Sequence, residues 1–447
     1  ELVGHHYRES DRTIEAARCF GLAGRRAVER AALQESITHY ETGIELLRSL
    51  ESGPERDELL LSLLILLANA LMGTGGPGSG DVIPVWEDAM ALAERIGNFD
   101  ELTSAMNGAA MYWSDRGDLD KTIDLATRIL EIAESSQSRI ASLRGHCTLG
   151  MAYLFQGDGA RSLGHSETGV GFEREGDFFT ITYGVGHDQG VFGRTMMSWA
   201  LWWVGRPDAS LAVALDADER AQRLPSSLTQ AMARHAVALA RHLRREGSLA
   251  IDAAIENVML TEELGIPFWL ATALMVLGAE RARGGDPAGL TDLDRAFTVL
   301  LEIGNQGGST MGLTLLAEAQ YGLGMIDEAV ATAEAGLAVS AGLDQPFYDP
   351  ELLRVKAAAL RLRGPDSYAA ADVALRESLA RSHALGAQSF TLRAAIDLVS
   401  LHDADPARSV EARAILDRAL RAMGDGATTV DHVAARSLLS VRAGDTS

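Results

Sequence analysis

Cysteine and lysine are nearly absent from this chain of 447 residues, which contains two of each. Cys19 and Cys147 are too few and too far apart for a disulfide framework, which is typical of a protein in a reducing cytosol. The only lysines are Lys121 and Lys356, and 62 acidic residues outnumber the 40 basic ones, giving a net charge of −22. This charge argues against direct binding of nucleic acid through phosphate neutralisation.

Long hydrophobic runs are also lacking. The most apolar stretch, residues 59–72, is too short to cross a membrane and contains Ser62 and Asn69, so it predicts a core helix. No signal peptide is found at the start. Because the chain opens with Glu1 and not with Met, we expect it to be a fragment of a longer cytoplasmic protein.

Motifs that carry chemistry are missing as well. The glycine-rich stretch 73–80 is not followed by Lys-Ser or Lys-Thr, so it does not match the phosphate-binding loop of nucleotide-binding proteins. We therefore predict that it is a flexible connector. No Gly-x-Ser-x-Gly nucleophile motif occurs. Adjacent residues on a helix point about 100° apart and cannot chelate a metal alone. The adjacent pairs with metal-ligating side chains are His5–His6, His146–Cys147 and His187–Asp188. The sequence therefore predicts no metal, no cofactor and no catalytic site in this chain.

What the chain does have is a repeat. Small or slim residues recur at positions i, i+4 and i+7, each time shortly before an expected helix end. The ten frames begin at Ser36, Val82, Thr122, Ser162, Ser210, Ala250, Gly289, Ala329, Ala371 and Ala412, so successive frames are 39 to 48 residues apart. A period of this size is typical of stacked helical hairpins.

The repeat predicts an all-α, tetratricopeptide-like right-handed superhelix of about ten helical hairpins that covers residues 1–447 as a single array. In each unit a first helix is followed by a turn with Gly or Asp and then by a second helix, whose slim positions let the two backbones approach. In such arrays each unit packs only on its neighbours. Two intervals are longer than the rest, which predicts enlarged loops at 73–80 and 170–186, and such insertions often mark a binding face.

An aromatic stripe stands out in the fifth unit. Phe192, Thr195, Trp199 and Trp202 follow one another at spacings of 3, 4 and 3, so they share one face of its first helix, the face that lines the concave groove in such arrays. Asp188 lies one turn before Phe192. An apolar groove with one carboxylate suits a partner helix, a peptide or a small ligand. The alternative is that the Trp rings fill the gap between the fifth and sixth units.

Similar reasoning applies to the aromatic starts of two later first helices, at Trp269 and at Tyr348, the latter followed by Glu351 and Arg354. Glu351 and Arg354 are three residues apart, so the alternative is that they pair on the helix surface. The candidate binding residues are Tyr183, His187, Asp188, Phe192, Thr195, Trp199, Trp202, Trp269, Tyr348, Glu351 and Arg354.

Six segments carry a resemblance to a known family. They are residues 1–7, 183–190, 199–205, 265–271, 347–354 and 392–395. In this order they resemble the C-terminal tetratricopeptide-like region of bacterial regulators in which an adenylate or guanylate cyclase domain and a STAND-type AAA-like ATPase precede the helical array. Residues 1–10 then correspond to the junction with the ATPase module. The chain departs from the pattern at His187, where relatives tend to have Gln, and at 424–426, which is usually aromatic.

The resemblance implies a cytoplasmic, non-catalytic sensor or scaffold that binds a protein, a peptide or a small effector on its concave face and regulates upstream ATPase or cyclase domains in cis. Two alternatives stay open. One is the effector-binding arm of a LuxR/MalT-like STAND transcription regulator, and the other is an assembly platform without a ligand. No membrane and no direct nucleic-acid partner is expected.

Overall fold

The computed structural model describes residues 12–30, 32–76, 78–174, 187–304 and 309–440, and every regular element in these ranges is a helix. The α-helices are α2 (Thr13–Glu29), α3 (Leu33–Arg48), α4 (Pro54–Gly75), α5 (Val82–Ile96), α6 (Phe99–Asp115), α7 (Leu119–Ser136), α8 (Arg139–Phe155), α9 (Gly159–Arg174), α10 (Gln189–Trp203), α11 (Pro207–Ala221), α12 (Ser227–Leu243), α13 (Gly247–Leu264), α14 (Pro267–Arg283), α15 (Ala288–Glu302), α16 (Ser309–Gly322), α17 (Ile326–Leu343), α18 (Asp349–Arg363), α19 (Tyr368–Ala384), α20 (Gln388–Leu401), α21 (Pro406–Ala422) and α22 (Val430–Ser440). Two 3₁₀ turns, η3 (Pro346–Tyr348) and η4 (Pro365–Ser367), precede α18 and α19.

These helices form ten hairpins, from α2–α3 to α20–α21, with α22 packed on the last one, which confirms the predicted all-α, tetratricopeptide-like superhelix. All ten slim frames lie on the second helix of a hairpin, and every frame residue is buried. The first helices pack on one another from α6 to α22 and form the inner layer, whereas the second helices pack outside them. Accordingly α10 buries 13 of its 15 residues and α11 only five.

The slim positions hold the two helices of a hairpin close together, most tightly in the seventh unit. A methyl group added at Gly289 of α15 would lie 2.3 Å from the carbonyl oxygen of Gly278 and 2.7 Å from the backbone nitrogen of Ala282, both on α14. Backbone atoms at a helix crossing cannot move aside as a flexible side chain can. A glycine is therefore required at this frame position.

We expect Gly289→Ala to lower the free energy of unfolding by about 1–3 kcal/mol, the usual cost of overpacking. Gly164 in α9 is the matched control, because an added methyl group there meets nothing within 4 Å. Gly164→Ala is expected to raise stability by about 0.5–1 kcal/mol, since alanine is the better residue inside a helix. Urea titrations of both variants check this, and equal stabilities would contradict the close crossing.

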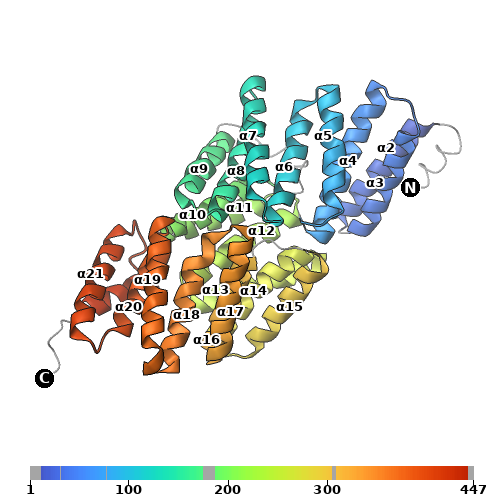
Figure 1. Cartoon of the computed structure of the whole chain (residues 1–447). Helices are drawn as coiled ribbons and strands as arrows, with labels where there is room; N and C mark the ends of the chain where they lie inside the picture. Colours follow the sequence, from blue (N-terminus) through green and yellow to red (C-terminus); the bar gives the residue numbers. More distant parts are fainter. Residues whose placement is uncertain (1–11, 31, 77, 175–186, 305–308, 441–447) are drawn as a thin grey trace.

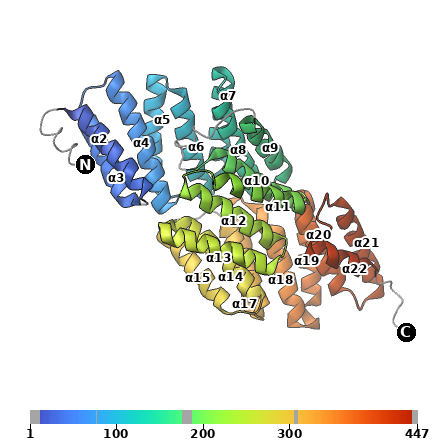
Figure 2. The same ribbon diagram turned by 180° about the vertical axis from the view of Figure 1, so that it is seen from behind.

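The superhelix coils more tightly than the sequence suggests, and its second turn lies on its first (Figures 1 and 2). The turn glycines of the third, fourth and fifth units rest on the loops that follow the eighth, ninth and tenth. Methyl groups added there would lie 3.0 Å from Leu343 for Gly117 and 2.8 Å from Leu385 for Gly157. Likewise α4 of the second unit contacts α14 of the seventh. The second to fifth units thus each touch the unit five places further on, and the expectation that units pack only on neighbours is wrong.

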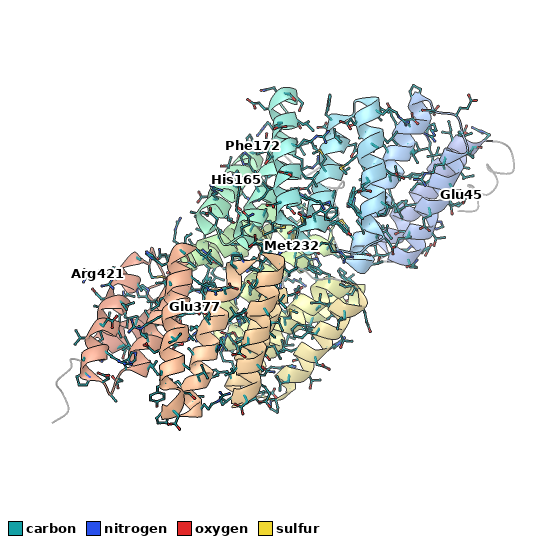
Figure 3. All side chains as sticks on the ribbon, viewed as in Figure 1. Glu45, His165, Phe172, Met232, Glu377 and Arg421 are labelled. Atoms are coloured by element: carbon teal, nitrogen blue, oxygen red, sulfur yellow. The ribbon has the colours of Figure 1, made fainter. Side chains whose placement is uncertain are left out.

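The space between the two turns is filled by side chains. Figure 3 shows Met232 of α12 in the middle of the molecule, whereas Glu45 and Arg421 lie toward opposite ends. Inner helices α8, α10, α12, α14 and α16 each contribute one buried methionine to the largest core cluster, and these are Met151, Met196, Met232, Met275 and Met311. Methionine fills irregular gaps well, which suits packing between two curved layers.

The two predicted loops and the apolar run overlap helices in the structure. The glycine-rich stretch 73–80 is not all loop, because α4 continues to Gly75, and the connector begins at Gly76. Residues 170–174 belong to α9, so the predicted loop 170–186 begins later, and residues 175–186 lie outside the described residues, as does the predicted junction at 1–10. The apolar run 59–72 lies within α4. That helix is long and apolar enough to span a membrane by length and composition alone, and half of its most apolar window is buried against other helices.

Candidate partner-binding face

Helix α10 carries the predicted aromatic stripe. Its start is fixed by Asp188, whose side chain accepts a hydrogen bond from the backbone N–H of Val191 at 2.8 Å, and its end by the turn at Gly205, where φ is +85°. Phe192, Thr195 and Trp202 are all at least 95% buried. The stripe therefore shares one face as predicted, but that face is not an open groove.

What covers the stripe is the second turn of the superhelix. The ring of Phe390 on α20 lies 4.9 Å from that of Trp202 and 5.3 Å from that of Trp203. Phe155 of α8 contacts both Trp199, at 6.2 Å, and Phe347 of η3, at 5.1 Å. The Trp rings thus bridge the fifth unit to the fourth and the tenth, and do not simply fill the gap between units five and six. We call this set the seam cluster; it comprises Phe155, Trp199, Trp202, Trp203, Phe347, Tyr348 and Phe390.

Asp188 does not supply a lone carboxylate to the stripe. Besides capping α10, it pairs with Arg220 of α11, with distances of 2.9 Å and 3.0 Å to the guanidinium nitrogens Nε and Nη2. Its backbone N–H donates to the Thr229 hydroxyl at 3.0 Å. The neighbouring His187 packs its ring 5.2 Å from that of Phe192. Both residues therefore fix the start of α10, and their role in binding stays a proposal.

The remaining candidates fall into two places. Tyr348 joins the seam cluster through Phe390, at 5.6 Å, and lies directly before Glu351 and Arg354 on α18. Trp269 lies at the start of α14, where it packs against His235 of α12 at 5.7 Å. The structure thus brings Trp199, Trp202, Tyr348, Glu351 and Arg354 into one region. Tyr183 lies outside the described residues.

Glu351 and Arg354 do pair, but not on an exposed surface, since they are 98% and 93% buried. Arg354 Nε lies 2.9 Å from Glu351 Oε2, and Arg354 Nη1 lies 2.8 Å from Asp397 Oδ2 of α20. They belong to a line of alternating charges along the first helices of the last five units and α22, which we call the inner ion-pair row. Its members are His242, Arg245, Glu280, Arg283, Glu318, Glu351, Arg354, Arg393, Asp397 and Asp431.

Most of the inner ion-pair row was missed by the sequence prediction, although a signal was present. Glu318 stands six residues before the turn glycine Gly324, a position that Trp199 occupies in the fifth unit. Arg354 stands ten residues before the turn glycine Gly364, a position that Thr195 occupies in the fifth unit. Charged side chains thus replace uncharged ones at these two inner positions. A charged residue at an inner position has to find a partner on the next first helix. The row is the result of that requirement.

Glu318 and Glu351 of the row remain ionised. Burial alone would raise the pKa values of Glu318 and Glu351, but nearby positive charges outweigh it and hold both pKa values below the ordinary range. For Glu351 these charges are Arg354 and Arg393, and for Glu318 they are led by Arg283. A fixed, compensated set of charges is unsuited to moving protons. The row links successive first helices, from α12 to α22, through buried ion pairs.

Buried polar atoms without a hydrogen-bond partner occur on both helix layers of the described residues, and three of those on the first helices bear on the inner face. They are the Asn107 Nδ2, the Trp199 Nε1 and the His235 Nδ1 atoms, each shielded from solvent. Asn107 and His235 stand ten residues before the turn residues Gly117 and Arg245, and Trp199 stands six before Gly205, so all three point to the inner side of their helices. A buried donor without a partner costs free energy. These atoms would gain partners if a polar ligand reached this face.

His235 also predicts a pH dependence. Burial lowers the pKa of His235 to about 4, against an ordinary value of 6.5. The unfolded state takes up the proton first, so stability is complete above pH 6.5 and declines as the pH falls from 6.5 toward 4, by up to about 3 kcal/mol from this residue. We expect His235→Phe to remove that part of the slope in urea titrations across this range. His383→Phe, at an exposed position of α19, should leave the slope as in the wild type.

In the described ranges, no group of three or more His, Cys, Asp or Glu side chains is placed to hold a metal ion. The two histidines nearest to each other, His146 and His165, face with their Nδ1 atoms 3.0 Å apart. Burial lowers the pKa of His146 to about 4 and also lowers that of His165, so this pair is a neutral hydrogen bond at pH 7.

The fold defines a tetratricopeptide-like helical repeat protein. Among solved structures, the chain is similar to the Rap conjugation gene regulator of the plasmid pLS20 in complex with the Phr* peptide, with a TM-score of 0.48, 12% identity and coverage of 91% of this chain and 95% of that one. It is also similar to aspartyl phosphate phosphatase F from Bacillus subtilis, with a TM-score of 0.42, 14% identity and coverage of 92% of this chain and 93% of that one. A third similar structure is a STAND protein with a tetratricopeptide repeat sensor from Pyrococcus horikoshii. Its TM-score is 0.36 at 11% identity, and the match covers 86% of this chain and 52% of that one. No protein-family model matches the sequence, and no curated protein is significantly similar to it.

Proposed function

We propose that this chain is a non-catalytic sensor segment that binds a protein or peptide partner on its inner face and passes that occupancy to an upstream ATPase or cyclase module of the same cytoplasmic protein. The observation that supports the binding part is that the first helices carry buried polar atoms without partners, among them those of Asn107, Trp199 and His235. A partner that offers two acceptors and an apolar surface would satisfy the Trp199 indole and the Asn107 amide and cover the adjoining rings.

Binding changes the output only if the partner prefers one arrangement of the array over another. The inner face meets this condition because its two sides belong to different units. Trp199 lies on the fifth unit, and the rings of Phe347 and Phe390, which complete the seam cluster, lie on the ninth and tenth. A ligand held there favours one spacing between the two turns of the superhelix. That spacing is the quantity an attached module would sense.

A random peptide display library, selected against the purified chain, tests the binding part. We expect the selected peptides to lose about tenfold or more in affinity for the Trp199→Ala variant, as is typical of a buried aromatic hot spot. Leu301→Ala is the control, because Leu301 is 80% exposed on the outer helix α15. Fluorescence anisotropy gives the affinities and circular dichroism confirms the fold. Failure to select any peptide, or equal binding to both variants, would count against this face.

A further inference from the structure

Residues 424–426, Gly-Asp-Gly, dock onto the turn between α10 and α11, more than two hundred positions earlier in the chain. The Gly424 N–H donates to the Gly205 carbonyl at 2.8 Å. The Asp425 carboxylate accepts from the backbone N–H groups of Asp208 and Ala209, at 2.7 Å and 3.1 Å. In return, the Asp208 carboxylate accepts from the Gly426 N–H at 2.9 Å. The contact is thus reciprocal and joins the tenth unit to the fifth.

This docking supplies a helix cap that α11 lacks. Arg206, in the cap position of α11, makes no side-chain hydrogen bond to the first turn, and the orphaned N–H groups are satisfied by Asp425 from the other turn of the superhelix. A carboxylate at a helix N-terminus also interacts favourably with the helix dipole. The sequence at 424–426 is therefore suited to the contact with α11.

Gly426 confirms that the loop is shaped for this contact. Its φ is +92°, and an added methyl group would lie 2.3 Å from the Pro207 side chain at the start of α11. A residue with a side chain would be strained in its backbone and would clash with the docking partner. The departure from an aromatic stretch that the sequence shows at 424–426 thus has a structural reason, which is close approach across the seam.

A small crevice lies at the seam beside this loop. It offers only about 10 Å³, close to the space of one water molecule, and is lined among others by Trp202, Pro207, Leu243, Ser389, Met423 and Asp431. Direct links across the seam are local, and they include the Arg393 side chain, which donates to the Leu243 carbonyl at 2.5 Å, and the Trp203 indole, which donates to the Leu385 carbonyl at 3.2 Å. Because these links join two separate runs of stacked hairpins, opening the seam need not unfold the hairpins on either side.

We propose that residues 424–426 form a latch that holds the two turns of the superhelix together in the free chain, and that release of the latch uncovers the inner face for its partner. The regulatory half rests on the proposed function, because it needs a partner on that face. In the closed state Phe390 packs on Trp202, and Phe347 packs on Phe155 beside Trp199. The apparent affinity for a partner is then the intrinsic affinity reduced by the small fraction of open molecules.

Two latch variants and one matched control test this. Asp425→Ala removes the cap on α11, and Gly426→Ala blocks the close approach to Pro207, so the two act by different means. Asp405→Ala is the control, because Asp405 accepts from the backbone N–H groups of Ala407 and Arg408 and caps α21 within its own unit. All three variants keep the inner face unchanged. The intact 447-residue chain is labelled with 5-fluorotryptophan, so that the six Trp residues give separate fluorine signals.

We expect the Trp202 and Trp203 signals of both latch variants to become several-fold more accessible to a soluble paramagnetic quencher. Trp86, which is fully buried in the second unit, serves as the internal reference and should not change, and Asp405→Ala should behave as the wild type. If both latch variants leave Trp202 and Trp203 as shielded as before, the loop is not a latch. An equal change in Asp405→Ala would mean general loosening and would also overturn the proposal.

The affinity of the latch variants for the selected peptides then distinguishes the two parts of the proposal, which are closure of the seam by the latch and regulation of partner binding by its release. If opening rises about tenfold, the same peptides should bind the latch variants about tenfold more tightly. Opened Trp signals with unchanged affinity would overturn the regulatory half. If no peptide binds at all, the proposed function has failed, whereas the fluorine signals still decide whether the latch closes the seam.

Discussion

Replacing Arg393 with methionine is expected to lower the free energy of unfolding by about 3–5 kcal/mol, the usual cost of removing one partner from a buried ion pair. Arg393 is 97% buried, and its Nη1 and Nε atoms lie 3.0 Å from Glu351 and 2.9 Å from Asp431. Its guanidinium also lies over the Trp202 ring at 4.9 Å. Methionine keeps the apolar stem but leaves two carboxylates buried with fewer partners. Urea titration measures the loss.

The control for this prediction is an exposed ion pair of similar geometry. Arg295 lies 2.7 Å from Glu262, and both side chains are about half exposed. Arg295→Met is expected to change stability only slightly, because solvent screens such pairs. A double-mutant cycle with Glu351→Gln adds a second check. Since Arg393 and Glu351 are in contact, the double variant should lose less than the sum of the single losses. A small effect of Arg393→Met would show that the row is not a stabilising element.

The repeat could be predicted from the sequence because its signal is local. Slim residues at i, i+4 and i+7 place one face of a second helix against the first helix of the same hairpin. This prediction needs no knowledge of which distant segments of the chain meet in the fold. All ten frames, from Ser36 to Ala412, lie on second helices and are buried. The shared face of Phe192, Thr195 and Trp202 follows from the same local geometry.

The closure of the superhelix could not be predicted in this way. Whether the tenth unit meets the fifth depends on small rotations between hairpins that add up over five steps, and no single residue encodes them. The partner of Trp202 is Phe390, and the cap of α11 is Asp425, each about 190 to 220 positions away. For this reason the sequence predicts either a groove-lining stripe or rings that fill the gap between units five and six, whereas in the structure the second turn of the array covers the stripe.

Phe390→Ala is expected to lower the free energy of unfolding by about 3–5 kcal/mol, because it removes a fully buried aromatic ring and leaves a cavity. Phe390 is 99% buried and contacts Trp202, Trp203 and Tyr348, so it is the ring at which the two turns meet. The matched control is Phe99→Ala, since Phe99 is 55% exposed at the start of α6. Its loss should cost far less.

The same variant distinguishes the seam from an ordinary core contact. Phe390 lies on the inner layer of the tenth unit, whose own hairpin contacts come from Leu392, Ala395 and Leu398 in a separate core cluster. If the seam separates as a unit, Phe390→Ala should broaden the urea transition or split it into two steps, because long repeat arrays lose cooperativity when an internal interface weakens. Phe99→Ala should keep a single transition. One sharp transition in Phe390→Ala, shifted only in its midpoint, would show instead that the two turns unfold together and that their contact is part of one cooperative core.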